Sequence, residues 1–122
     1  MARILLVDED QDYLDHMTFV LGWWGHEASE ERSAQHAVTR FRNEGFDLVI
    51  TGMFMPDMDG LDLIADVRHI SPDAKIIVLA SNGRHSIHAY IQSAAKAMGA
   101  AAVIHKWALY SELNRVIAEV LE

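Results

Sequence analysis

Short, wholly apolar runs alternate along the chain with longer segments in which apolar residues recur every three or four positions. The clearest run is residues 4–7, Ile-Leu-Leu-Val, which is followed directly by acids. Uniformly apolar, branched runs of this length are typical of strands buried on both faces of a sheet. Similar runs occupy residues 48–50, 76–79 and 102–104, with a weaker candidate at residues 27–30. The pattern therefore predicts five short strands.

The segments between these runs carry apolar stripes of helical period. The stripes are Leu14, Met17 and Leu21; Ala34, Ala37, Val38 and Phe41; Ile64, Val67 and Ile70; Ile87, Tyr90, Ile91, Ala94 and Met98; and Leu109, Leu113, Val116, Ile117 and Val120. Gly25, Gly45 and Gly99 stand where helices are expected to end. Strands that alternate with helices predict one α/β domain over residues 1–122, with a parallel sheet covered on both faces.

In a sheet of this kind, the residues that follow the strands meet at one edge and form the functional site. Asp8 and Glu9 follow the first strand, Gly52 ends the third, Ala80 ends the fourth and Lys106 follows the fifth. Carboxylates beside a lysine can form a corner for Mg²⁺ and phosphate, because Mg²⁺ prefers carboxylate oxygens and lysine is a mobile cation. The alternative is that the acids only cap the following helix, whose dipole favours them.

Segments at residues 4–10, 47–60 and 99–106 carry a more specific signal. Their sequences are Ile-Leu-Leu-Val-Asp-Glu-Asp, then Asp-Leu-Val-Ile-Thr-Gly-Met-Phe-Met-Pro-Asp-Met-Asp-Gly, and finally Gly-Ala running to Val-Ile-His-Lys. Together they resemble the receiver domain of two-component response regulators over nearly the whole chain. The resemblance implies a flavodoxin-like, three-layer (βα)5 sandwich with a parallel five-stranded sheet of order 2-1-3-4-5.

The resemblance also implies roles for the residues at the strand ends. Asp8 and Glu9 match the acidic pair that binds Mg²⁺ in the family, and Lys106 matches the lysine that contacts the phosphoryl group. The aspartate that a histidine kinase phosphorylates is matched by Gly52, and the hydroxyl residue of the family's switch is matched by Ala80. Glycine has no group that could form an acyl phosphate. Alanine has no hydroxyl to donate to a phosphoryl group.

Three further expectations follow from departures from the family pattern. Trp107 stands where the family usually has a proline, so the Lys106–Trp107 bond is expected to be trans, since a cis bond without proline costs about 2.5–4 kcal/mol. With fewer carboxylates in the pocket, Mg²⁺ is expected to bind weakly through Asp8 and Glu9. Lys106 is expected to reach Asp8 or Glu9 directly.

The sequence therefore favours a pseudo-receiver, a non-enzymatic phosphorelay module that contacts a histidine kinase or another signalling protein without aspartyl phosphorylation. The fourth helix, fifth strand and fifth helix are the expected contact face, also for a homodimer. Trp24 and Trp107 are candidate contact residues because aromatic side chains are enriched in binding hot spots. Two alternatives stay open: a conventional response regulator seen as an Asp-to-Gly variant at position 52, and a small metal-dependent phosphohydrolase that uses Asp8 and Glu9.

Composition argues against some other partners and locations. A net charge of −8 argues against a nucleic-acid-binding domain, which needs a basic face. No apolar run approaches the roughly 20 residues that a membrane-spanning helix requires, so no membrane contact is expected. The chain has no cysteine, which is compatible with a reducing compartment, and a cytoplasmic location is expected.

Overall fold

The computed structural model describes residues 1–81 and 85–122, although the side chains of residues 85–89 and 91 lie outside that description. Its strands are β1 (Arg3–Val7), β2 (Glu27–Glu31), β3 (Leu48–Gly52), β4 (Ile76–Ala80) and β5 (Ala102–His105). Its helices are α1 (Gln11–Trp23), α2 (Ala34–Asn43), α3 (Gly60–Ile70), α4 (His85–Ala97) and α5 (Tyr110–Leu121). Every strand expected from the sequence is present, including the weaker β2.

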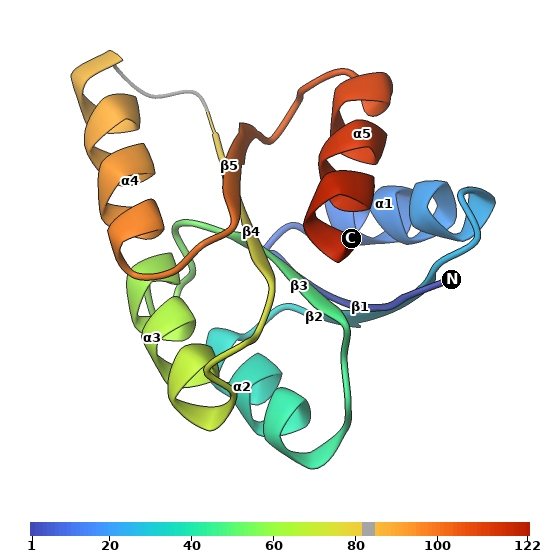
Figure 1. The fold of residues 1–122 in the computed structure, drawn as a ribbon, viewed down its shortest axis with the longest axis horizontal. Coiled ribbons are helices and arrows are strands. Elements are labelled where there is room, and N and C mark those ends of the chain that lie inside the picture. The colour runs from blue at the N-terminus through green and yellow to red at the C-terminus, as the bar shows by residue number, and fades with distance from the viewer. Residues whose placement is uncertain (82–84) are drawn as a thin grey trace.

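The strands form one parallel sheet of order β2-β1-β3-β4-β5. Helices α1 and α5 cover one face of this sheet, and α2, α3 and α4 cover the other (Figure 1). This is the flavodoxin-like, three-layer arrangement that the sequence predicted.

Strands β1, β3, β4 and β5 contribute alternate residues to two separate cores. Ile4 and Leu6 pack under α1 and α5, whereas Leu5 and Val7 pack under α2 and α3. Successive side chains of a strand point to opposite faces, so a strand covered on both sides must be apolar at every position. This requirement explains the uninterrupted apolar runs in the sequence.

Helix α1 corrects one expectation. Trp24, expected as an exposed contact residue, is half-buried and packs against the core, with its ring centroid 6.4 Å from that of Tyr110. Trp23 is the exposed member of the pair, at 80%. The reason is periodicity: the buried positions Met17 and Val20 continue at helical spacing to residue 24, and residue 23 falls outside this stripe.

The stripes expected in the last two helices also need correction. In α4, Ala95 is fully buried while Tyr90 is 70% exposed, and Met98, directly after the helix, is 40% exposed. The stripe that faces the sheet is therefore rotated from the expected one. Two other members of the expected stripe, Ile87 and Ile91, lie outside the described side chains. Leu109 is 74% exposed because it precedes α5 as its N-cap residue.

Of the helices in the described part of the chain, none combines the length and apolarity that crossing a membrane requires.

Asp57, in the loop between β3 and α3, ties that loop to the start of α2. Its carboxylate accepts hydrogen bonds from the Ser33 hydroxyl at 2.9 Å and from the backbone N–H groups of Ala34 at 3.1 Å and Gln35 at 2.9 Å. The bond from the Gln35 N–H, with those from Ser33 and Ala34, lowers the pKa of Asp57. N–H groups in the first turn of a helix have no partner within the helix, so the distant carboxylate caps α2.

Replacing Asp57 with Ala is expected to lower the free energy of unfolding by about 1 kcal/mol at neutral pH, the usual loss for a helix cap. Because the folded-state pKa is lowered, the carboxylate stabilises the fold above its unfolded pKa and loses this effect as pH falls through the folded pKa. The difference between wild type and variant should therefore shrink in acid, measured by urea unfolding at neutral and acidic pH. Asp66→Ala, on the exposed side of α3, is the control and should change stability little at either pH. A difference for Asp57→Ala that persists unchanged in acid would contradict the assignment.

Candidate functional site

The carboxyl ends of β1, β3, β4 and β5 meet at one edge of the sheet. The register pairs Val7 with Thr51, Gly52 with Leu79, and Ala80 with His105, so the residues that follow these strands converge. A cavity of about 80 Å³ lies there, lined by Asp8, Glu9, Gly52, Met53, Phe54, Leu79, Ser81 and Lys106. The structure thus brings together four residues that the sequence predicted for the site: Asp8, Glu9, Gly52 and Lys106.

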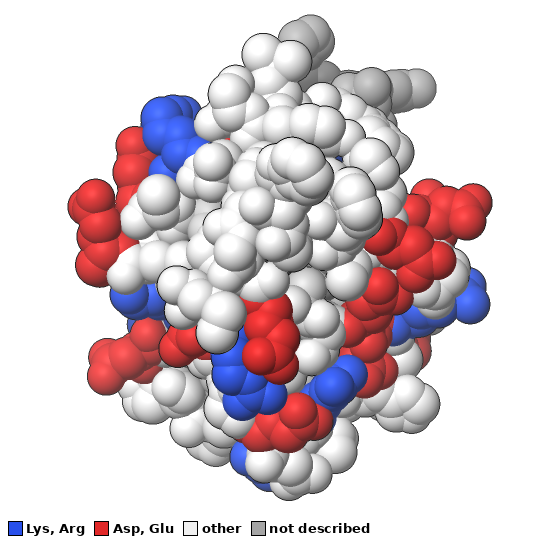
Figure 2. Space-filling model, turned by 90° about the vertical axis from the view of Figure 1, so that its right-hand side faces the viewer, with Lys and Arg blue, Asp and Glu red and all other residues white. Residues whose placement is uncertain are grey.

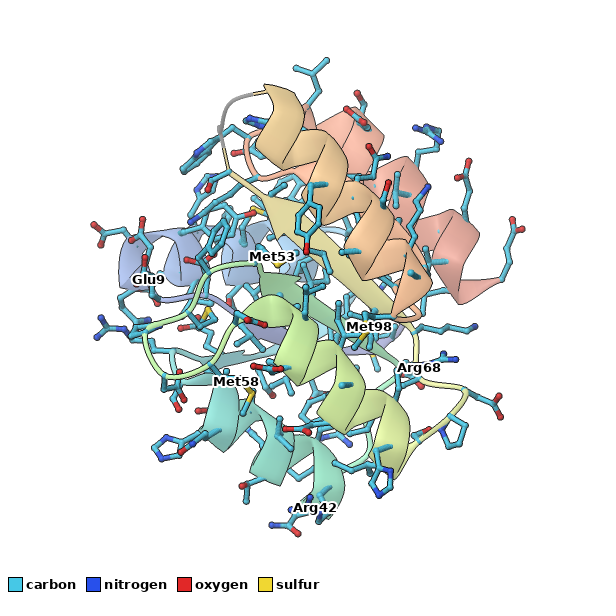
Figure 3. All side chains as sticks on the ribbon, turned by 90° about the vertical axis from the view of Figure 1, so that its left-hand side faces the viewer. Glu9, Arg42, Met53, Met58, Arg68 and Met98 are labelled. Atoms are coloured by element: carbon cyan, nitrogen blue, oxygen red, sulfur yellow. The ribbon has the colours of Figure 1, made fainter. Side chains whose placement is uncertain are left out.

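The acids that follow β1 have different environments. Asp8 is 3% exposed and turns into the cavity. Glu9 is exposed and lies at the periphery of the molecule, whereas Met53 lies inside it (Figure 3). Asp10 caps α1 by accepting hydrogen bonds from the N–H groups of Asp12 and Tyr13. Helix capping, the alternative interpretation of these acids, therefore holds for Asp10 but not for Asp8.

Lys106 pairs directly with Asp8, as expected from the sequence. The distance from Lys106 Nζ to Asp8 Oδ1 is 3.0 Å, and the two side chains are only 14% and 4% exposed. The same carboxylate oxygen accepts the backbone N–H of Asp10 at 2.9 Å. A buried carboxylate is tolerated when it is both paired and hydrogen-bonded, and Asp8 meets both conditions.

Gly52 faces this ion pair without a side chain. A Cβ atom placed on Gly52 would lie 3.0 Å from Asp8 Oδ2 and 3.8 Å from the sulfur of Met55. The Asp8 carboxylate thus lies directly against the glycine, close to the direction in which a side chain would leave residue 52. Ala80 is 1% exposed and offers only a methyl group at the end of β4, while Ser81 is exposed.

Aromatic rings surround the lysine. Its Nζ lies 4.4 Å from the centroid of the Tyr13 ring and 5.7 Å from that of Trp107. The two rings meet edge to face, 5.2 Å apart, and the Tyr13 hydroxyl donates to the Lys106 carbonyl at 3.3 Å. Burial, with a smaller effect of the Asp8 carboxylate, raises the pKa of Tyr13, so its hydroxyl stays protonated and remains a donor.

The sequence interpretation overlooked Tyr13. Its signal was its place in the buried stripe of α1, one helical turn before Met17 and directly after the acids that follow β1. The described residues contain no cis peptide bond, so the bond between Lys106 and Trp107 is trans, as expected.

The small cavity offers few oxygen ligands for a resident divalent cation. Mg²⁺ requires several oxygen ligands in near-octahedral geometry. Asp8 already pairs with Lys106, Glu9 faces solvent, and residue 52 contributes no oxygen. Among the residues that the structure describes, no group of three or more acids, histidines or cysteines is placed to hold a metal. The residues present therefore do not fit a resident Mg²⁺.

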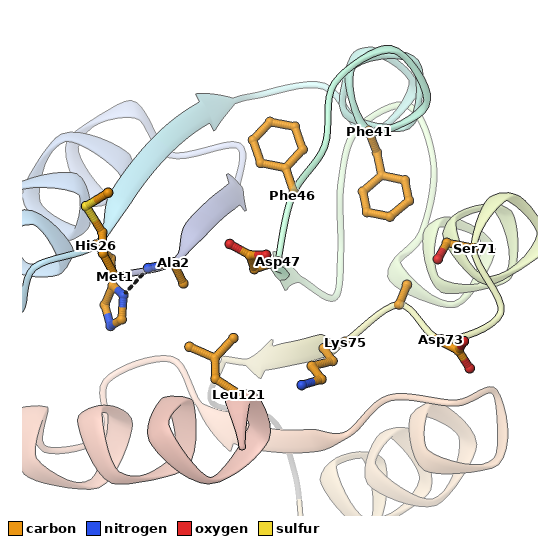
Figure 4. Close-up of a pocket in the computed structure, with 11 residues that line it drawn as sticks. Met1, Ala2, His26, Phe41, Phe46, Asp47, Ser71, Asp73, Lys75 and Leu121 are labelled. Carbon is orange, nitrogen blue, oxygen red and sulfur yellow. Dashed lines mark hydrogen bonds between the residues drawn. The ribbon is translucent and has the colours of Figure 1, made fainter.

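A larger cavity, of about 550 Å³, lies at the opposite end of the sheet, beside the start of β1 and the end of α5 (Figure 4). Phe41, Phe46 and Leu121 supply its apolar lining, and Asp47, Asp73 and Lys75 supply charges of both signs. His26 accepts the Ala2 N–H there, and burial with the nearby N-terminal ammonium lowers its pKa. None of the residues that the resemblance singles out lines this cavity, so the small cavity at the carboxyl edge is the candidate site.

Known proteins match both the sequence and the fold. The response regulator receiver protein Anae109_2439 of Anaeromyxobacter sp. is 32% identical over 82 residues, which cover 67% of this chain and 34% of that protein. The crystal structure of a response regulator receiver domain protein from Clostridium thermocellum has a TM-score of 0.91 at 25% identity, and the match covers 99% of this chain and 94% of that one. For the response regulator TrrA from Thermotoga maritima, solved in complex with Mg²⁺-BeF, the TM-score is 0.86 at 26% identity, over 98% and 99% of the two chains.

The chain thus spans about a third of the length of the Anaeromyxobacter relative. The family model described as the response regulator receiver domain matches residues 4–118. The sheet order, the convergence of Asp8 and Lys106 at the carboxyl edge, and this match agree. The chain belongs to the response regulator receiver domain family.

Proposed function

We propose that this chain is a pseudo-receiver, which takes part in two-component signalling through protein contacts and without phosphorylation of an aspartate. It would act as a binding module and not as an enzyme. The observation that carries the proposal is Gly52 at the carboxyl end of β3, in contact with the buried Asp8–Lys106 pair. A phosphoryl group can be held covalently only by an acceptor side chain, and residue 52 has none.

The neighbouring aspartates do not replace the missing acceptor. Asp57 caps α2 through its bonds from Ser33, Ala34 and Gln35, and Asp59 caps α3 by accepting the Asp62 N–H at 2.9 Å. Asp8 is neutralised by Lys106. Each of these carboxylates is committed to a contact that stabilises the fold, which supports loss of the phosphorelay chemistry.

Mg²⁺ is expected to bind weakly through Asp8 and Glu9. An incoming cation would compete with the Lys106 ammonium for the Asp8 carboxylate, and Glu9 is the only other acid that lines the small cavity among the described residues. Complexes such as that of TrrA with Mg²⁺-BeF are therefore not expected to form here.

Exposed apolar side chains indicate where partner proteins would bind. Tyr90 of α4, Met98 directly after that helix, and Trp107 and Leu109 of the loop that precedes α5 are 40–74% exposed. We propose the face formed by α4, β5 and α5 for contact with a histidine kinase, another signalling protein or a second copy of the chain.

On helix α1, Phe19 and Trp23 are exposed at 69% and 80%, and Trp23 takes the contact role first expected of Trp24. Figure 2 shows the side formed by α1 and α5: uncharged side chains cover its upper and central part, with acidic and basic groups at the margins. Exposed aromatic side chains are a common feature of protein-binding surfaces.

The second candidate function is a conventional, phosphorylatable response regulator seen as an Asp-to-Gly variant at position 52. The intact Lys106 and Asp8 favour it, because both match the family's pocket. Ala80 speaks against it, since a single substitution at position 52 would leave the residue at the end of β4 unchanged.

Incubation with acetyl phosphate and Mg²⁺ is expected to leave the intact mass unchanged, because residue 52 offers no carboxylate that could attack phosphorus. The Gly52→Asp variant is the matched comparison. We expect it to gain a phosphoryl group with amide NMR shifts confined to the residues around position 52, because Ala80 cannot hydrogen-bond to that group and transmit a wider change. A stoichiometric adduct on the wild-type chain would overturn the proposal. Labelling of the variant together with a conformational response would favour the conventional regulator.

Gly52→Asp should also change the response to Mg²⁺. The added Cβ lies 3.0 Å from Asp8 Oδ2, and the added carboxylate repels that of Asp8, so the variant should be less stable than wild type without metal. Millimolar Mg²⁺ should raise the melting temperature of the variant and leave that of the wild type nearly unchanged. Gly52→Asn, of the same size but without charge, is the control and should not respond. An equal rise for wild type and Gly52→Asp would contradict weak binding by Asp8 and Glu9 alone.

A further inference from the structure

A second cavity, of about 240 Å³, lies between α1 and the loop that joins β5 to α5. Its lining residues are Tyr13, His16, Met17, Lys106, Trp107, Ala108, Leu109, Tyr110 and Leu113. It shares Lys106 with the small cavity at the carboxyl edge, but Asp8, Glu9 and Gly52 do not line it. The cavity is therefore distinct from the remnant of the phosphorylation pocket.

The walls of this cavity suit a small ring. Met17 and Leu113 are 3% and 5% exposed, so their contribution to the lining is part of the hydrophobic core. Tyr13, Trp107 and Tyr110 add aromatic surface. An apolar cavity of about 150 Å³ is enough to hold benzene. A space of about 240 Å³ can therefore accept one aromatic ring together with a short polar arm.

The charge of the lining is opposite to that of the chain. The chain carries a net charge of −8, yet none of the described residues that line this cavity has a carboxylate. Lys106 is cationic, and its Nζ lies 4.4 Å and 5.7 Å from the ring centroids of Tyr13 and Trp107, which both line the cavity. The ammonium has three N–H donors, and the side-chain acceptor it contacts is Asp8. It can thus donate to a second anion beside the aromatic rings.

We propose that this cavity binds a small aromatic carboxylate, with its ring against Met17 and Leu113 and its carboxylate on Lys106. Uncharged and cationic analogues of the same shape would bind less well, because only an anion gains a charge-assisted hydrogen bond from the ammonium. The inference goes beyond the proposed function: it requires neither the presence nor the absence of phosphorylation.

The test uses phenylacetate, phenylacetamide and phenethylamine as probes and follows the indole N–H signals of the protein by ¹⁵N NMR. The chain has three tryptophans, so the readout is specific to position. Phenylacetate should shift the Trp107 signal in a saturable manner and leave that of the exposed Trp23 unchanged. Phenylacetamide should bind about tenfold more weakly, as expected for the loss of one charge-assisted hydrogen bond. Phenethylamine should bind more weakly still.

Variants of Asp8 and Lys106 distinguish the effect of the lysine charge on phenylacetate binding from the effect of the cavity's shape. The double variant Asp8→Asn/Lys106→Met removes both charges, which avoids a buried unpaired carboxylate, and should bind phenylacetate no better than phenylacetamide. Asp8→Asn alone frees the ammonium from its partner and should bind phenylacetate several-fold more tightly than wild type. Trp23→Phe assigns the control signal and should leave binding unchanged.

Three results would overturn the proposal. The first is equal affinity of the wild type for phenylacetate and phenylacetamide. The second is no saturable shift of the Trp107 signal, or an equal shift of the Trp23 signal. The third is weaker phenylacetate binding by Asp8→Asn. Absence of an acetyl phosphate adduct bears only on the pseudo-receiver proposal, so the two can fail separately.

Discussion

The buried ion pair between Asp8 and Lys106 organises the carboxyl edge of this domain. The two residues are 98 positions apart, and β3 and β4 lie between their strands in the sheet. Those intervening strands end in Gly52, which has no side chain, and Ala80, which has only a methyl group. Removing one partner of such a pair leaves a buried, uncompensated charge, which typically costs about 3–5 kcal/mol. The contact therefore constrains β1 and β5 together and leaves little of the Asp8 carboxylate for a ligand.

Aromatic side chains complete this arrangement on the α1 side. Tyr13 and Trp107 lie around the Lys106 ammonium, with their ring centroids 4.4 Å and 5.7 Å from its Nζ. The rings shield the ammonium from water, which strengthens its attraction to the carboxylate. Trp107 also helps to line the cavity between α1 and the loop before α5.

Most of the fold could be predicted from the sequence, because apolar runs and helical stripes indicate which strands and helix faces are buried. Even β2, with only one apolar residue, was located by its place in the alternation. The contact of Lys106 with Asp8 was also predictable, since the resemblance brings these positions together and a missing carboxylate leaves the lysine one fewer partner. The roles of Gly52, Ala80 and Glu9 remain predictions of the resemblance.

Other features depend on tertiary contacts that no local pattern encodes. Asp57 caps a helix that lies earlier in the chain, and nothing near residue 57 identifies that partner. The prediction that Tyr90 and Met98 belong to a buried stripe was wrong. Several apolar residues in and after α4 allow more than one face of the helix to be buried. The exposure of Trp23 could have been found by extending the stripe of Met17 and Val20 by one more turn.

The central claim is that this pocket cannot hold a phosphoryl group because its acceptor is absent and its remaining carboxylate is held by lysine. Titration with beryllofluoride and Mg²⁺, the combination seen in the TrrA structure, tests this directly when amide NMR spectra are recorded at each step. The account predicts that the signals of Gly52, Ala80 and Lys106 stay in place at saturating reagent. A second, stoichiometric set of signals for these residues would contradict it.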